Sequence, residues 1–161
     1  MRQASLGIGG YPAPEWDVPT WFNTGGGEPL HLADLTTPVV YLYCFQSWCP
    51  GCHSHGFPTL AEVRRRSGED DVTFVAVQTV FEGHDVNTSE RALASVAQHG
   101  LSDIAVGHDP GRDGGPPDIM RSYRTGGTPW TVIIGPERRV CFDGFQIDPD
   151  TATAIVGQLA R

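Results

Sequence analysis

The chain has 161 residues, which is enough to bury one sizeable hydrophobic core within one domain. Its formal net charge of -8 at pH 7 argues against a nucleic-acid surface, because such surfaces need clustered Lys and Arg. No apolar stretch approaches the roughly 18–20 residues that span a bilayer, and residues 1–7 lack the apolar segment of a signal peptide. We therefore expect a cytoplasmic protein that has neither nucleic acid nor membrane among its partners.

The N-terminal part, residues 1–37, is rich in Pro, Gly and Trp. Its side chains Trp16, Val18 and Trp21 are too apolar for a disordered tail. We expect one or two short strands here, with a turn at residues 25–27. This segment should pack as an extension on a single domain that spans residues 1–161.

Two nearly continuous apolar runs, residues 39–45 and 72–80, predict strands that are buried on both faces of a sheet. Between them, residues 50–66 predict a helix. Pro58 should kink this helix, because proline cannot donate to the helical hydrogen bonds and crowds the preceding turn. The basic run at residues 64–66 should complement the helix dipole at its C-terminal end.

The second half of the chain predicts a helix, a short strand, another short helix, a β-hairpin and a last helix. Asn87 and Glu90 have the spacing of a capping box, and the helix that they open should reach Gly100. The remaining expected elements are a strand at 104–106, a loop at 107–115, a helix from 116 to 123, a hairpin of strands 130–134 and 140–145, and a helix opened by Asp148 and Pro149. This order predicts an α/β domain in which a parallel section of sheet carries an antiparallel hairpin.

The most informative motif is Trp48-Cys49-Pro50-Gly51-Cys52, which directly follows the first buried strand. Two cysteines three positions apart at a helix start can close a small disulfide and reopen it. Unpaired backbone N–H groups and the helix dipole lower the pKa of the first thiol there. With only four cysteines in a chain expected to be cytoplasmic, such a pair is more often catalytic or metal-binding than structural.

The strand, the Trp-Cys-x-x-Cys motif and the later Gly127-Thr128-Pro129 before a hairpin resemble the thioredoxin-like superfamily. The N-terminal extension and the added helix are similar to its TlpA-type and AhpC/TSA (redoxin) branch. The resemblance covers the chain from about Pro12 to Leu159. It implies a three-layer α/β/α sandwich with a mixed central sheet, an N-terminal β extension and an inserted helix.

The resemblance also implies a thiol–disulfide oxidoreductase that works through a reversible Cys49–Cys52 disulfide. Cys49 would be the nucleophile, with a pKa below the free value of about 8.5, and Cys52 would resolve the mixed disulfide. Pro129 would follow a cis peptide bond beside the cysteines, a conformation found at only about 5–6% of X-Pro bonds. No cofactor and no metal are implied; the partners would be a protein or small-molecule disulfide and an electron-donor thiol system. The substrate-binding residues would be Trp48, Pro50, Gly51 and Thr128.

The sequence departs from the family pattern around the second cysteine. Pro58 lies six residues after Cys52, one more than the usual spacing, so the helix should contain a local bulge. Residues 53–56 supply no acid where TlpA-type members often carry a Glu, so no proton acceptor for Cys52 is assigned. The peroxidatic signature Pro-x-x-x-Thr-x-x-Cys is absent, since Leu42 stands where its proline would be.

Other interpretations of the same residues remain open. Cys49 to His53 matches the haem-attachment motif Cys-x-x-Cys-His, and Cys49, Cys52, His53 and His55 are ligand types that bind zinc. The chain could also be a redox-sensing binding module without turnover, or a weak peroxidase that uses the same two thiols. Otherwise we expect His53 and His55 to be solvated or to tune the thiols.

Cys44 and Cys141 fall in predicted strands. Because free cysteine is among the most buried residue types, we expect both side chains to pack in the core.

Overall fold

The computed structural model describes residues 5–161, so the first four residues of the predicted N-terminal extension lie outside it. A single mixed sheet runs in the order β1-β4-β3-β2-β5-β6. Its strands are β1 (Thr20–Phe22), β2 (Val39–Phe45), β3 (Val72–Thr79), β4 (Ala105–Asp109), β5 (Trp130–Ile134) and β6 (Val140–Gly144). The α-helices are α1 (Phe57–Arg66), α2 (Ser89–Gln98), α3 (Asp118–Ser122) and α4 (Pro149–Leu159), with a short 3-10 turn at Leu32–Asp34.

The centre of the sheet is parallel and its edges are antiparallel. Strands β2, β3 and β4 run parallel, while β5 pairs antiparallel with β2, and β6 with β5. Every residue of β2 is buried, as the apolar run predicted, because this central strand is covered on both faces. Strand β4 continues to Asp109, so His108 and Asp109 belong to a strand and not to the loop expected at 107–115.

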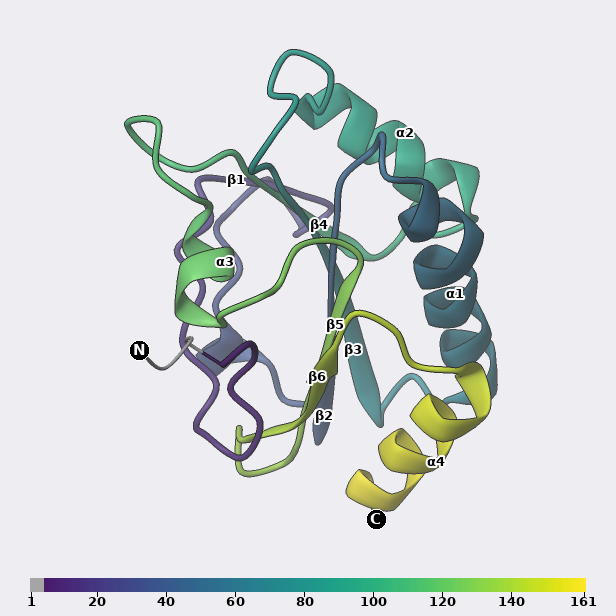
Figure 1. The fold of residues 1–161 in the computed structure, drawn as a ribbon. Coiled ribbons are helices and arrows are strands. Elements are labelled where there is room, and N and C mark those ends of the chain that lie inside the picture. The colour runs from purple at the N-terminus through teal and green to yellow at the C-terminus, as the bar shows by residue number, and fades with distance from the viewer. Residues whose placement is uncertain (1–4) are drawn as a thin grey trace.

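Helices cover both faces of this sheet, which gives the predicted three-layer α/β/α sandwich (Figure 1). Helices α1, α2 and α4 pack on one face, where Phe57, Val96 and Val156 share one hydrophobic core with the buried rings of Tyr41 and Tyr43. Helix α3 and the N-terminal segment cover the other face. Among residues 5–161, no helix is long and apolar enough to cross a membrane.

The N-terminal segment completes the second core. Trp16, Val18 and Trp21 are buried, and β1 adds to the sheet as an antiparallel edge strand beside β4. The indole Nε1 of Trp16 donates to Tyr123 Oη over 3.0 Å, and Tyr123 Oη in turn donates to the Pro14 carbonyl. This part of the chain is therefore held to α3 by both apolar burial and buried hydrogen bonds.

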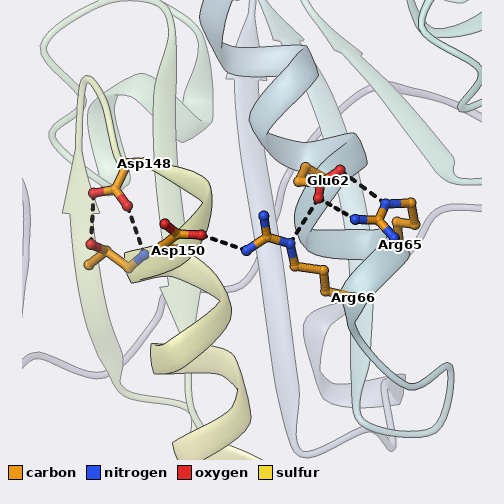
Figure 2. Close-up of polar contacts among 6 residues, drawn as sticks. Glu62, Arg65, Arg66, Asp148 and Asp150 are labelled. Atoms are coloured by element: carbon orange, nitrogen blue, oxygen red, sulfur yellow. Dashed lines mark hydrogen bonds and ion pairs between the residues drawn. The ribbon is translucent and has the colours of Figure 1, made fainter.

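The sequence predicted the N-terminal cap of α4 correctly and placed the cap of α2 one residue too early. Helix α4 is capped by Asp148, as expected: its Oδ1 accepts from the Thr151 backbone N–H over 2.8 Å (Figure 2). Helix α2 is capped by Thr88, whose Oγ1 accepts from the Arg91 N–H, so the capping box predicted from Asn87 is wrong by one residue. Asn87 is instead buried, and its side chain serves the site described below.

The basic run ends α1 as predicted, and it also joins two helices. Arg66 contacts Glu62 within α1 and reaches Asp150 at the start of α4, with its Nη1 2.7 Å from Asp150 Oδ1 (Figure 2). Arg65 pairs with the same Glu62. These pairs are exposed, so they orient the helix ends more than they stabilise the fold.

The helix that begins at Pro50 contains a π-helical turn at Cys52–Gly56, and this confirms the predicted local bulge. A π turn accommodates one extra residue within a helix, and Pro58, which has no N–H to donate, lies two residues after its end. The Cys52 carbonyl accepts from the Phe57 N–H and also from Tyr43 Oη, which lies 3.0 Å away. Gly56 leaves the space that the Tyr43 hydroxyl occupies, because a Cβ on Gly56 would overlap it.

We predict that Gly56→Ala destabilises the protein by about 1–3 kcal/mol, because the added methyl group forces Tyr43 or the π turn to move. Gly157→Ala is the matched control, since Gly157 is exposed in α4 with open space around it. That change should stabilise by up to about 1 kcal/mol through helix propensity. Urea unfolding measures both, and equal stability of Gly56→Ala and the parent protein would contradict the account of the π turn.

Candidate active site

The two cysteines lie where the chain leaves the buried strand β2 and enters the helix that continues into α1. Cys49 is half-buried and Cys52 is fully buried, and both are free thiols. The Cys52 backbone N–H points at the first cysteine: it lies 3.2 Å from Cys49 Sγ and 3.2 Å from the Cys49 carbonyl. Cys49 Sγ thus lies against a backbone N–H at a helix start, where a negative charge is favoured.

The pKa values of the two thiols are shifted in opposite directions. The pKa of Cys49 is lowered to about 6, chiefly because the Cys52 thiol donates a hydrogen bond to it. Burial opposes this shift, whereas the backbone N–H of Cys52, the Thr128 hydroxyl and the Gly51 backbone add to it. Burial, and then the bond to Cys49, raises the pKa of Cys52 well above its ordinary value. At neutral pH the pair therefore holds one thiolate, on Cys49, and one thiol, on Cys52.

The loop before β5 brings the distant residues Thr128 and Pro129 to the cysteines. The Thr128–Pro129 peptide bond is cis. The Pro129 ring lies against the start of the helix, because a Cβ on Gly51 would be 3.4 Å from Pro129 Cδ. Trp130 then enters β5 opposite Cys44 of β2, so sheet pairing holds this loop in place.

Exposed aromatic rings lie directly before Cys49 in the chain and over the loop that precedes Pro129. Trp48 is 44% exposed, and its ring covers Gly83, whose added Cβ would lie 2.6 Å from Trp48 Cη2. Phe145 is also 44% exposed, and its ring meets that of Trp130 edge-on with centroids 4.9 Å apart. Pro50 is exposed beside Cys49. Trp48 and Pro50 thus give the surface beside Cys49 an apolar character, and Phe145 covers Gly126 and Gly127 of the loop before Pro129.

Three buried carboxamide side chains support this region, and sequence reasoning missed all of them: Gln46, Gln78 and Asn87. Gln78 Oε1 accepts from both the backbone N–H and the hydroxyl of Ser47, at 2.7 and 2.6 Å. Asn87 Oδ1 accepts from the Trp48 N–H over 3.1 Å. The backbone just before Cys49 is therefore fixed by side chains of other segments. A lone polar residue inside an apolar strand, such as Gln78, is the signal that could have indicated this role.

Gln78 and Asn87 also donate hydrogen bonds through their side-chain amide N–H groups. Gln78 Nε2 donates to the Thr88 carbonyl over 2.9 Å and to His108 Nδ1 over 3.2 Å. Asn87 Nδ2 donates to the Glu82 carbonyl. Each amide thus connects the segment before Cys49 to the segment that leads into α2, and buried amides satisfied in this way hold a single geometry.

His53, which the sequence predicted to be solvated or to tune the thiols, is half-buried and lies between two hydrogen-bond partners. Its Nε2 lies 2.7 Å from the Ser47 carbonyl, and its Nδ1 lies 2.9 Å from His99 Nε2. Burial, and then the charge of His53, lowers the pKa of His99. The Nε2 atom of His55 is buried and has no hydrogen-bond partner among the described residues. Within residues 5–161, no three His, Cys, Asp or Glu side chains are grouped to hold a metal ion.

Besides burial, the groups that shift the pKa of the Cys52 thiol are the Cys49 thiol, the Gln46 backbone and the Tyr43 hydroxyl. None of these groups is a carboxylate. The proton of Cys52 is therefore shared mainly with Cys49 itself, and burial keeps the Tyr43 phenol neutral by raising its pKa.

The two remaining cysteines differ from each other. Cys44 is fully buried in β2, as expected, and burial raises the pKa of its thiol. Cys141 is exposed on β6, so the expectation that it packs in the core is wrong. The strand containing Cys141 lies at the edge of the sheet, where only Val140 turns fully inward.

Comparison with known proteins places this arrangement among related structures. No protein-family model matches the chain, and no curated protein matches it in sequence. A crystal structure of a thioredoxin-like superfamily protein is 33% identical, covering 93% of this chain and 96% of that one, with a TM-score of 0.84. A thiol-disulfide isomerase from Corynebacterium glutamicum is 32% identical, covering 92% and 96%, with a TM-score of 0.81.

A third structure shows the same fold at lower identity. The thioredoxin domain of a thiol-disulfide oxidoreductase from Bacteroides vulgatus is 17% identical, covering 98% of this chain and all of that domain, with a TM-score of 0.73. The two structures above 30% identity span nearly the whole chain, and their fold matches the mixed sheet and helices described above. The chain belongs to the thioredoxin-like superfamily.

Proposed function

We propose that the protein is a thiol–disulfide oxidoreductase that works through a reversible disulfide between Cys49 and Cys52. The observation that carries this proposal is the divided protonation of the two thiols. Cys49 is accessible and has a pKa of about 6, so it is a thiolate at neutral pH. Cys52 is buried one helical turn away and stays protonated until it is needed. Such a pair can attack a disulfide and then release the product.

In the forward direction, the Cys49 thiolate attacks one sulfur of the substrate disulfide. The substrate S–S bond breaks, a Cys49–substrate disulfide forms, and the other substrate sulfur leaves as a thiolate. Cys52 then loses its proton to this leaving sulfur or to solvent and attacks Cys49 Sγ. The second substrate thiolate leaves, so the substrate gains two electrons and the protein carries a Cys49–Cys52 disulfide. An external dithiol must reduce that disulfide before the next cycle, and no cofactor takes part.

The residues around Cys49 are suited to receive the substrate. Trp48 and Pro50 are exposed beside the sulfur, and the buried Pro129 ring against Gly51 closes the other side. Thr128 is half-buried next to Cys49, and we propose that its backbone pairs with an extended segment of the substrate. An apolar border of this kind favours a disulfide within a polypeptide over a small hydrophilic one. The cytoplasmic location predicted from the sequence stays a prediction.

We expect alkylation of Cys49 by iodoacetamide to follow a midpoint near pH 6, because only the thiolate reacts and the pKa of Cys49 is about 6. The exposed Cys141 would react too, so the measurement uses a Cys141→Ser background. Mass spectrometry of the labelled peptide should show modification at Cys49 and not at the buried Cys52. A midpoint near pH 8.5, the value of an ordinary thiol, would contradict the proposed nucleophile.

In the same background, Cys52→Ser should accumulate a mixed disulfide with a substrate such as insulin, because the resolving thiol is gone. Cys49→Ser should form none, and both variants should reduce insulin at the uncatalysed rate when dithiothreitol is the donor. Mass spectrometry and insulin turbidity measure the two effects. If Cys52→Ser traps a mixed disulfide but the parent protein reduces insulin without multiple turnover, the result would favour a redox-sensing module instead. Rapid dithiol-dependent consumption of hydrogen peroxide without insulin reduction would favour a peroxidase.

A further inference from the structure

The imidazole ring of His53 closes the segment that carries both cysteines. Its Nε2 lies 2.7 Å from the carbonyl oxygen of Ser47, two residues before Cys49. At the other end, the ring belongs to the residue that directly follows Cys52. The contact therefore joins the two ends of residues 47–53, with both sulfurs between them. Ser47 is buried, so its carbonyl depends on a partner within the protein.

A second imidazole, from a different helix, holds this ring in place. His99 caps the C-terminal end of α2, and its Nε2 lies 2.9 Å from His53 Nδ1. The His99 ring stacks on Phe57 of α1, with centroids 4.6 Å apart and planes at 11°. Both imidazoles are half-buried. Each nitrogen of the His53 ring thus has a partner, and the ring has one orientation.

The direction of these hydrogen bonds follows from the groups involved. A carbonyl oxygen can only accept, so the proton of the bond to Ser47 is on His53 Nε2. In a neutral imidazole the other nitrogen then has a lone pair, so His53 Nδ1 accepts and His99 Nε2 donates. His99 therefore selects the one neutral tautomer of His53 that can donate to Ser47.

We propose that His53 is a positioning residue that holds Cys49 and Cys52 together in the reduced protein. His99 acts through it, by fixing the ring in the tautomer that this requires. The inference rests on the proposed exchange between dithiol and disulfide. Within the closed segment, the Cys52 N–H lies 3.2 Å from Cys49 Sγ. The two thiols are therefore confined before any bond forms between them.

The consequence is that His53 favours the disulfide relative to the dithiol. When glutathione disulfide oxidises the pair, the glutathione S–S bond breaks and a Cys49–Cys52 bond forms. The two electrons and two protons of the protein dithiol go to the two glutathione thiols that are released. Thiols that are already confined lose less freedom on ring closure. In the oxidised protein the S–S bond itself confines the segment, so removing the His53 bond frees chiefly the reduced form.

A merely structural role for His53 predicts something different. If the two imidazoles only held α1 against α2, their loss would lower the stability of the reduced and oxidised proteins equally. The equilibrium with glutathione would then stay the same. If His53 positions the thiols, its loss moves that equilibrium toward the dithiol. Urea unfolding of both redox forms provides the comparison.

The test measures the fraction of protein disulfide in glutathione buffers by mass spectrometry, in a Cys141→Ser background. We expect His53→Phe to shift the equilibrium toward the dithiol by about three- to tenfold, the range for one buried hydrogen bond. His99→Phe keeps the stacked ring and should shift it in the same direction, and the double variant should match His53→Phe alone. His53→Gln keeps an N–H for the carbonyl and should stay near the parent.

A second readout needs no disulfide. In the reduced protein, amide hydrogen exchange at Cys52 should be faster in His53→Phe than in the parent, because the segment opens more often. His31→Gln is the matched control, since His31 is exposed and its side chain makes no cap hydrogen bond. That change should alter neither readout.

Two results would overturn the proposal: an unchanged glutathione equilibrium in His53→Phe, or the same shift in His53→Phe and His53→Gln. Should His53→Phe fail to fold, His99→Phe decides, and an unchanged equilibrium in that variant would have the same consequence. A parent protein that forms the disulfide but does not reduce insulin would refute the proposed oxidoreductase and leave this equilibrium measurable. If the parent formed no disulfide, the proposed function would fail, while unchanged amide exchange alone would refute the role of His53.

Discussion

The buried end of strand β2 is the constraint on which the rest of the site depends. All seven of its residues are enclosed, and the chain stays buried through Gln46 and Ser47 before it emerges at Trp48. Backbone groups in such a place cannot turn to water, so other parts of the protein must satisfy them. Gln78 and Asn87 do so, and the segment before Cys49 consequently has little freedom. The accessible sulfur is presented by a rigid support.

Burial and the helix start then divide the two thiols. Both cysteines lie in the first turns of one helix, yet only Cys49 reaches the surface. The charge therefore collects on Cys49, while burial keeps the proton on Cys52. A thiolate that is stabilised in the reduced protein also makes the disulfide more strongly oxidising, because the dithiol state is favoured. The π turn after Cys52 keeps this arrangement despite the extra residue before Pro58.

The sequence predicted the architecture more closely than the supporting contacts. Apolar runs located β2 and β3 because strands buried on both faces leave a continuous pattern, and the hairpin pattern located β5. The spacing of Cys52 and Pro58 indicated the bulge, and the motif at Thr128 and Pro129 indicated the loop beside the cysteines. Periodicity carries no information about the partners of a buried amide, so Gln46, Gln78 and Asn87 were missed. For the same reason the helix cap predicted at Asn87 and the core position predicted for Cys141 are wrong.

The most direct test of the central claim is the equilibrium between the Cys49–Cys52 pair and glutathione buffers of known potential. The account predicts one reversible two-electron transition that requires both cysteines and persists in Cys141→Ser. Because the reduced state is stabilised at Cys49, the midpoint should be less negative than about -270 mV, the value for thioredoxin. A pair that does not form a disulfide across the whole range, or one that cannot be reduced again, would contradict the account.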